Sequence, residues 1–360
     1  MGFVPTLKSY MYTRVLPLLM PRSEVIAVYP EGKTQTPILT VCDQMTWQDI
    51  SNEHAAVSVT PHNWQRAFGC GQTFKLFLCE AAWKGAVGAT WRAQVYKDGR
   101  VFYENRRELL KLLDKCKAEK IPTVFWAKED PAFFQNATYD FTDTALRFDY
   151  ILTTAEECIA KYHALGHKQV YLWSFGFSPN LYYPPSGKDG GGRENIAVFA
   201  GSWYADLPER CNDLLIIFDR VLESKISLRI YDRYRNNGRS SKPFPEKYQP
   251  YVEDYIASKA LGEVYRNVQY AINVNTVCDS TTMFARRVYE AMSCGAIVVS
   301  NPSIGMHKQF GNNVWFVDEG FDFKNIEMIR QNNIETVFAQ HTWGKRMSQL
   351  FTLVGCERDQ

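Results

Sequence analysis

Residues 270–300 read YAINVNTVCDSTTMFARRVYEAMSCGAIVVS, and this stretch decides the fold. Two runs in it, Tyr270–Val274 and Ala296–Ser300, are rich in β-branched and other apolar residues, which is typical of short buried strands. The segment between them predicts a helix that Ser280 or Thr281 caps. A strand, a helix and a second strand in this order predict parallel strands joined by a helical crossover.

The same alternation continues on both sides of this stretch. In the first half the expected strands are Glu24–Tyr29, Ile38–Cys42, Ala55–Val59, Lys75–Cys79, Ile121–Trp126, Tyr150–Thr153 and Val170–Leu172, with a helix at Arg106–Lys120. In the second half the other expected strands are Asn195–Ala200, Ser227–Tyr231 and Val314–Val317, with helical patterns from Pro208 onward and over Ile326–Phe351. This pattern predicts an α/β fold of parallel sheets with helices on both faces.

The length of the chain, 360 residues, suits two domains of average size. Residues 183–193 read YPPSGKDGGGR, and their prolines and glycines mark the best domain boundary. We therefore expect two Rossmann-like domains, residues 1–184 and residues 194–360, joined by a linker at 185–193 and facing a central cleft. In such sheets ligands bind beyond the carboxyl ends of the strands, so the residues at those ends are the first candidates for a site.

In the second domain the predicted helix from Thr281 to Gly295 presents free backbone N–H groups and the positive end of its dipole at its first turn. This is a natural seat for a diphosphate. Glu290 would lie roughly 13–15 Å farther along the helix, near the ribose of the same nucleotide. The alternative is an ordinary surface ion pair, because Arg286 and Arg287 stand one helical turn before Glu290.

In the first domain, carboxylates follow three separate strands. Asp43 and Glu80 come directly after expected strands, and Glu129 and Asp130 follow Lys128 just beyond a third. Carboxyl ends of parallel strands meet at one edge of the sheet, so these groups can supply acid–base chemistry there. For each of them the alternative is a helix cap or a solvated loop end.

Charge and composition exclude several kinds of partner. The net charge is +2 and both signs are spread evenly, so no basic stripe for nucleic acid is present. No apolar run is long enough to cross a membrane, although a peripheral contact with an anionic membrane surface stays open. The start of the chain does not resemble a secretory signal, and the odd number of cysteines, 9, fits small buried residues in a reducing compartment. We therefore expect a cytoplasmic protein.

Six motifs, taken together and in order, resemble the CgeB-type glycosyltransferases, which have the two-Rossmann GT-B architecture. The resemblance covers roughly residues 37–350. The motifs are CEAAWKG (79–85), IPTVFWAKEDP (121–131), FDYILTTAEECIAKYHALGH (148–167), FSPNLYYP (177–184), FAGSWY with LPERCNDLL (199–215) and RRVYEAMSCG (286–295). In this architecture the last helix crosses back to pack on the first domain.

The resemblance implies roles for single residues of the donor end. Glu290 would bind the donor ribose, and Arg287 matches the family's Arg three positions before it. Gly201 would let the backbone approach the donor, Arg210 would contact the diphosphate and Tyr231 would face the base. The full donor-binding set is Gly201, Arg210, Tyr231, Asn275, Ser280, Thr281, Arg287 and Glu290.

The catalytic candidates are the carboxylates of the first domain, Glu129 or Asp130 first and then Asp43 and Glu80. Many retaining members of the wider fold place a Glu eight residues before the ribose Glu; Thr282 stands there, which leaves the stereochemistry open. No Asp-x-Asp triplet occurs, the motif that holds a divalent metal in transferases of another architecture. We therefore expect no metal and no other cofactor, with arginines and a helix N-terminus neutralising the leaving diphosphate.

The sequence thus predicts a transferase that moves a sugar from a nucleotide-diphosphate donor to a hydroxyl of a glycan, a lipid-linked glycan or a protein. Uridine diphosphate sugars are the commonest donors for the fold. Two alternatives stay open. One is a sugar-nucleotide 2-epimerase of the same fold, which would consume donor without an acceptor, and the other is a binding protein or a non-catalytic homologue.

Overall fold

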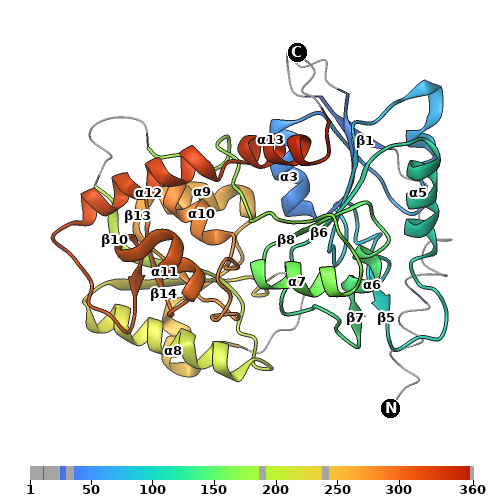
Figure 1. Ribbon diagram of the computed structural model, residues 1–360. Coiled ribbons are helices and arrows are strands. Elements are labelled where there is room, and N and C mark those ends of the chain that lie inside the picture. Colours follow the sequence, from blue (N-terminus) through green and yellow to red (C-terminus); the bar gives the residue numbers. More distant parts are fainter. Residues whose placement is uncertain (1–10, 12–24, 30–35, 186–191, 237–242, 357–360) are drawn as a thin grey trace. The chain divides into compact units, whose positions relative to one another are not determined.

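The computed structural model describes residues 11, 25–29, 36–185, 192–236 and 243–356, which divide into two compact units (Figure 1). Unit 1 comprises Met1–Ser174 with Trp343–Gln360, and unit 2 comprises Phe175–Thr342. Most of the predicted linker, residues 186–191, lies outside the described residues. The chain enters unit 2 ahead of that linker because the side chains of Phe177 and Tyr182 are buried in the core of unit 2.

Unit 1 is built on a seven-stranded sheet in the order β1-β3-β2-β4-β6-β8-β9. All neighbouring strands are parallel except β1 and β3. The central strands are buried on both faces, which explains their continuous apolar runs. The strands are β1 (Ile26–Val28), β2 (Ile38–Val41), β3 (Ala56–Ser58), β4 (Phe77–Glu80), β6 (Thr123–Ala127), β8 (Tyr150–Thr153) and β9 (Val170–Leu172).

The helices of unit 1 include the C-terminal helix of the described chain. That helix, α13, packs on α3, and its Trp343 ring lies 5.6 Å from the rings of both Trp126 and Trp173. The helices are α3 (Gln44–Glu53), α4 (Trp64–Ala67), the 3₁₀ helix η2 (Gly69–Gly71), α5 (Arg107–Ala118), α6 (Phe141–Ala145), α7 (Glu156–Ala164) and α13 (Trp343–Leu353). A two-stranded sheet of β5 (Lys97–Asp98) and β7 (Tyr139–Asp140) completes the unit.

Unit 2 is built on a parallel six-stranded sheet in the order β12-β11-β10-β13-β14-β15. Successive strands run outward from β10 on one side and from β13 on the other, so the strand order reverses between these two. Such a switch point is where open α/β sheets bind ligands. The strands are β10 (Glu194–Gly201), β11 (Ser227–Asp232), β12 (Val252–Glu253), β13 (Val268–Asn273), β14 (Ile297–Ser300) and β15 (Trp315–Phe316).

Helices cover both faces of the unit 2 sheet, with α8 on one face and α9 and α10 on the other (Figure 1). Side chains alternate between two apolar cores: Ile272 points to the α8 side, and Ala271 points to the α10 side. The helices are α8 (Pro208–Glu223), η3 (Glu246–Tyr251), α9 (Ser258–Asn267), α10 (Arg287–Ser293), α11 (Ile304–Phe310), η4 (Gly311–Asn313) and α12 (Ile326–Gln340).

Two helix predictions need correction. The predicted helix capped by Ser280 or Thr281 begins only at Arg287, although Gly295 adopts a φ of +80° just past its end, as its position predicted. The helical pattern over Ile326–Phe351 belongs to two helices, α12 and α13, which are separated at His341 and Thr342.

Two further sequence expectations concern cysteines and membranes. The eight cysteines whose side chains the structure describes are free thiols, and six of them are buried, as expected for small apolar residues. Among the described helices, none combines the length and the hydropathy that a membrane span requires.

Candidate functional site

The carboxyl edge of the unit 1 sheet brings together two carboxylates and a lysine. Lys128 Nζ lies 2.8 Å from Glu80 Oε1 and 3.2 Å from Asp43 Oδ2. The backbone N–H of Asp43 also donates to Glu80 Oε1, at 2.6 Å. Glu80 ends β4, and Asp43 and Lys128 lie just beyond β2 and β6, so these strand ends meet at one edge as predicted. We call Asp43, Glu80 and Lys128 the acidic lock.

Asp43 holds a turn of the backbone as well as the lysine. Its carboxylate accepts the N–H groups of Trp83, Lys84 and Gly85 at 3.0, 2.8 and 2.9 Å. Burial alone would raise the pKa of Asp43, but Lys128 and these three donors outweigh it and lower the pKa. Asp43 therefore stays ionised and is a weak base.

Glu80 is the innermost member of the lock. Its side chain is 0% exposed. Burial raises the pKa of Glu80, and the neighbouring Lys128 offsets part of that rise. A carboxylate without solvent access and already bonded to Lys128 is suited to holding that lysine in place, not to meeting a substrate.

Glu129 and Asp130 differ in access. Glu129 is partly exposed, and burial raises its pKa although Lys128 and a hydrogen bond from Trp83 pull the pKa down. Asp130 is 3% exposed, accepts the Thr153 hydroxyl at 2.7 Å, and has its pKa raised to about 7 by burial. Of the four predicted catalytic carboxylates, Glu129 best combines a raised pKa with access.

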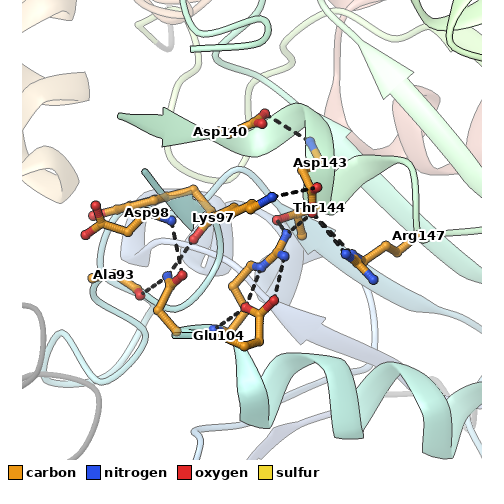
Figure 2. A network of polar contacts seen from close by, with 11 residues as sticks. Ala93, Lys97, Asp98, Glu104, Asp140, Asp143, Thr144 and Arg147 are labelled. Carbon is orange, nitrogen blue, oxygen red and sulfur yellow. Dashed lines mark hydrogen bonds and ion pairs between the residues drawn. The ribbon is translucent and has the colours of Figure 1, made fainter. Parts of the chain in front are cut away.

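The loops that follow β4 and β6 form a small module at this edge. The ring of Trp83 from the first loop packs against Phe133 from the second loop and against Phe141, the first residue of α6, with centroids 5.1 and 5.2 Å away. Arg106 is 0% exposed and donates to Asp143 Oδ1 at 2.7 Å and to Glu104 Oε2 at 2.8 Å. Figure 2 shows the surrounding network, in which Glu104 approaches from the segment before α5 and Asp143 from α6. The charge of Arg106 is thus paired within the protein.

At the carboxyl edge of unit 2, two arginines approach the end of β10. Arg210, in the first turn of α8, donates to the carbonyl of Ser202 at 3.2 Å and lies 4.8 Å from the ring centroid of Tyr204. Arg287, the first residue of α10, donates to the carbonyl of Ala200 at 2.5 Å. We call Arg210 and Arg287 the arginine pair.

The arginine pair carries charge that its protein partners do not neutralise. Arg210 is 8% exposed, and burial, together with the nearby Arg287, lowers its pKa to about 10. No ion pair among the described residues includes either arginine. With a pKa of about 10, Arg210 is still a cation at neutral pH, so this end of the switch point attracts an anion.

Glu290 lies in the first turn of α10, not far along a longer helix as predicted. Arg286 Nε is 2.7 Å from Glu290 Oε1, with side chains 13% and 4% exposed. The i,i+4 ion pair that the sequence left open therefore forms, but it is buried and not on the surface. This places Glu290 one turn from Arg287 and holds its carboxylate in a fixed position.

Gly201 and Tyr231 lie on neighbouring strands. A Cβ at Gly201 would be 2.5 Å from the ring of Phe199, so this strand end requires glycine for internal packing in addition to any donor approach. Tyr231 is partly buried beside Arg229 and Glu253, and burial is the main cause of its raised pKa. Its ring thus belongs to the face of β11 that carries Arg229.

Asn275, Ser280 and Thr281 belong to the loop before α10. Asn275 Oδ1 accepts the N–H of Ala285 at 3.2 Å, and Ser280 Oγ accepts the N–H of Met283 at 3.0 Å. The bond of Ser280 is the one that an N-cap residue makes, but Asn275 takes the N–H of Ala285, which a helix beginning at Thr281 would use, and this bond competes with an early helix start. Thr281 therefore does not stand at a helix N-terminus, and the predicted helical seat for a diphosphate at this residue is wrong.

Two residues in these sites, Lys128 and Trp83, received no role from the sequence. Lys128 directly precedes Glu129 and Asp130 at the end of a predicted strand, and this neighbourhood of opposite charges could have indicated an ion pair. Trp83 acts through contacts with residues that are distant in the sequence, and no local pattern assigns it. Within the part of the chain that the structure describes, no group of three or more His, Cys, Asp or Glu residues is arranged to hold a metal ion.

Comparison with protein families gives one match. A family described as "Glycosyl transferase-like" matches residues 231–352, about a third of the chain. The matched region contains Arg287 and Glu290 and excludes Arg210. No curated protein matches the chain.

Solved structures match most of the chain. An alpha-glucosyltransferase in complex with UDP and a 13-mer DNA containing a central A:G mismatch matches 84% of this chain and 85% of its own, at 13% identity and a TM-score of 0.52. A sucrose-phosphate synthase from Thermosynechococcus elongatus matches 82% and 78%, at 14% identity and a TM-score of 0.46. TarM matches 78% of this chain and 54% of its own, at 9% identity and a TM-score of 0.45. The first match confirms the predicted GT-B fold of two Rossmann-like domains.

Proposed function

We propose that the chain is a glycosyltransferase that moves a sugar from a nucleotide-diphosphate sugar to an acceptor hydroxyl. The observation that carries the proposal is the arginine pair: buried Arg210 and partly buried Arg287 both approach the end of β10 at the switch point of unit 2, and no ion pair among the described residues includes either of them. The glycosyl transferase-like match over residues 231–352 supports this reading. A UDP-sugar is the favoured donor, as one structure of the same fold holds UDP.

In this proposal the donor lies against unit 2. Arg210 and Arg287 bind the diphosphate, because guanidinium groups match phosphate oxygens in charge and geometry. Glu290, one helical turn beyond Arg287, accepts hydrogen bonds from the ribose hydroxyls. Tyr231 is assigned to the base, and the loop residues Asn275, Ser280 and Thr281 shape the site.

The chemical step uses a carboxylate of unit 1. Glu129 takes the proton of the acceptor hydroxyl, whose oxygen forms a bond to the anomeric carbon of the sugar. The bond from that carbon to the diphosphate oxygen breaks, and the nucleoside diphosphate leaves with the electron pair. The arginine pair stabilises the departing charge, so the proposal needs no metal ion.

The acceptor is assigned only by class: a glycan, a lipid-linked glycan or a protein, with polysaccharide biosynthesis in the cytoplasm as the proposed setting. A DNA is present with the alpha-glucosyltransferase of the same fold. The even charge of the present chain, +2 overall, argues against a nucleic-acid acceptor here. The CgeB-type, hexose-transferring assignment rests on the six sequence motifs.

The donor site is tested with Glu290→Ala and the matched Arg286→Ala, which breaks the same ion pair from the other side. Isothermal titration calorimetry with UDP should show binding by the parent and a loss of roughly tenfold or more for Glu290→Ala, since a buried carboxylate bonded to hydroxyls is removed. Arg286→Ala should lower the affinity for UDP by a smaller factor. Equal losses would mean that only the ion pair matters, and unchanged affinity for Glu290→Ala would contradict the assignment.

A second measurement separates transfer from epimerisation. Incubation with UDP-sugar alone should give at most slow hydrolysis to the free sugar and UDP. Formation of an epimeric UDP-sugar in the absence of any acceptor would contradict transfer and support the 2-epimerase.

A further inference from the structure

The arginine pair comes from two separate segments, the first turn of α8 and the start of α10. The second segment is preceded by residues 276–286, which are not helical. For both guanidinium groups to meet one diphosphate, that loop has to be fixed relative to α8, because small displacements weaken hydrogen bonds and charge pairing. The structure contains a buried polar connection between the two segments.

Asn301, at the carboxyl end of β14, is 2% exposed and bridges the two segments. Its Oδ1 accepts the N–H of Asn275 at 2.9 Å, and its Nδ2 donates to the carbonyl of the same residue at 3.0 Å. The same Nδ2 donates to Asp213 Oδ2 of α8 at 2.7 Å. Asp213 is three residues after Arg210, so both lie on one side of α8.

The loop is tied to the same region at further points. The N–H of Ile304 donates to the carbonyl of Cys278 at 2.9 Å, and Asn301 Nδ2 lies 3.2 Å from Cys278 Sγ. A Cβ at Gly305 would be 3.1 Å from the carbonyl oxygen of Ser280, so the loop packs closely on the start of α11. The path from Asp213 through Asn301 to Asn275 therefore reaches a loop with little room to shift.

Asp213 takes part in no ion pair among the described residues, and the partner that the structure gives it is an amide. By electrostatics alone, a carboxylate one turn from Arg210 weakens the binding of an anion. Any favourable contribution of Asp213 to a diphosphate site therefore has to come from where it holds the chain and not from its charge.

We propose that Asp213 and Asn301 are positioning residues of the donor site, which fix the loop 276–286 and Arg287 against α8 so that the arginine pair faces one diphosphate. This inference rests on the proposed function. It assigns neither residue a contact with the donor, since each acts through the hydrogen bond that joins them and through Asn275.

The test compares Asp213→Ala, Asp213→Asn and Asp219→Ala by titration with UDP, with melting temperature measured on each variant. Asp213→Ala removes the bond to Asn301 and should weaken UDP binding about five- to tenfold. Asp213→Asn keeps an acceptor for Asn301 while removing the charge, and should bind within twofold of the parent. Asp219, six residues farther along α8, accepts a hydrogen bond from the Tyr248 hydroxyl at 2.7 Å, so Asp219→Ala is the matched control for lost stability without lost affinity.

Each outcome decides the inference. If Asp213→Ala lowers the melting temperature but binds UDP like the parent, as Asp219→Ala should, the connection is merely structural and the inference is wrong. Tighter binding by Asp213→Ala would show that charge outweighs position, and would also overturn it. Absence of UDP binding by the parent would remove the proposed donor site and the inference with it, whereas parent binding with unaffected variants would remove the inference alone.

Discussion

The carboxyl edges of the two sheets occupy the same place in two related folds, but their charged side chains are paired differently. In unit 1 the charged side chains form ion pairs with one another: Lys128 lies within 3.2 Å of both Asp43 and Glu80. In unit 2 the described partners of Arg210 and Arg287 are carbonyl oxygens and aromatic rings. The first edge is neutralised from within, and the second is left for a ligand to neutralise.

This difference separates stability from binding. A buried ion pair that is complete is costly to break, because the remaining charge stays desolvated. A buried cation without a counter-ion is already unfavourable, as the lowered pKa of Arg210 indicates, and a bound anion relieves that strain. Substitutions at the two edges should therefore act on different measured quantities.

The largest expected effect is on turnover and comes from Glu129→Gln. The variant keeps the shape of the side chain and its hydrogen bond to Trp83 but cannot take a proton, so the transfer rate should fall by roughly 100- to 10,000-fold. UDP affinity should be unchanged, because the residue lies in the other unit. The transfer rate is measured with donor and acceptor present, and the UDP affinity is measured by titration.

Glu119→Gln is the matched control for this prediction. Glu119 is an exposed carboxylate of the same unit, paired with Lys115 at the end of α5. It should leave the rate within twofold of the parent. Full activity of Glu129→Gln would show that another group acts as the base.

The next effect is on stability and comes from Lys128→Met. The substitution leaves Glu80 and Asp43 beside each other without their cation, and should lower the free energy of unfolding by about 3–5 kcal/mol. Adding Glu80→Gln should restore part of this loss. Urea denaturation of the single and double variants measures these changes in the free energy of unfolding. If the loss in the double variant equalled the sum of the losses in the two single variants, Lys128 and Glu80 would not stabilise each other and the acidic lock would be wrong.

A smaller effect depends on pH and concerns Asp130. Its folded-state pKa of about 7 lies above the unfolded value, so its contribution to stability is complete below about pH 4 and is lost as the pH rises through 7. Asp130→Asn should remove about 2–4 kcal/mol of this decline. The difference in unfolding free energy between parent and variant, measured at pH 5 and pH 8, gives the result. A difference that does not change with pH would mean that Asp130 is not protonated in the folded chain.

The smallest effect on stability is expected from Arg210→Met, the counterpart of Lys128→Met at the other edge. The lost hydrogen bond and ring contact are offset by relief of a buried charge, so the unfolding free energy without ligand should change by no more than about 1 kcal/mol. The rise in melting temperature caused by UDP should nevertheless shrink. If Arg210→Met were as destabilising as Lys128→Met, the contrast between the two edges would fail.

The sequence predicts the sheets of this protein well, and for a physical reason. Strands such as Ile38–Val41 and Ile297–Ser300 are buried on both faces, so their apolar runs are continuous and easily recognised. The helix before Gly295 was predicted too long because Asn275 bonds to the backbone N–H of Ala285, which a helix beginning at Thr281 would use. Such competition depends on how the loop folds and leaves no periodic signal.

The two candidate sites were predictable to different degrees. Carboxylates at strand ends can be located from the sequence because the topology brings those ends together. The exposure of these carboxylates to solvent cannot be predicted in the same way. Glu80 and Glu129 look alike in the sequence, yet the first is fully buried and the second is partly exposed. The connection from Asp213 to Asn301 spans 88 residues, and no local rule relates the two.

The central claim is that a nucleoside diphosphate binds at the arginine pair of unit 2. A crystal structure of the protein grown with UDP tests this most directly. We expect phosphate oxygens within hydrogen-bonding distance of the guanidinium groups of Arg210 and Arg287, and the ribose hydroxyls at Glu290. A diphosphate bound elsewhere, with both arginines still bonded only to carbonyl oxygens, would contradict the account.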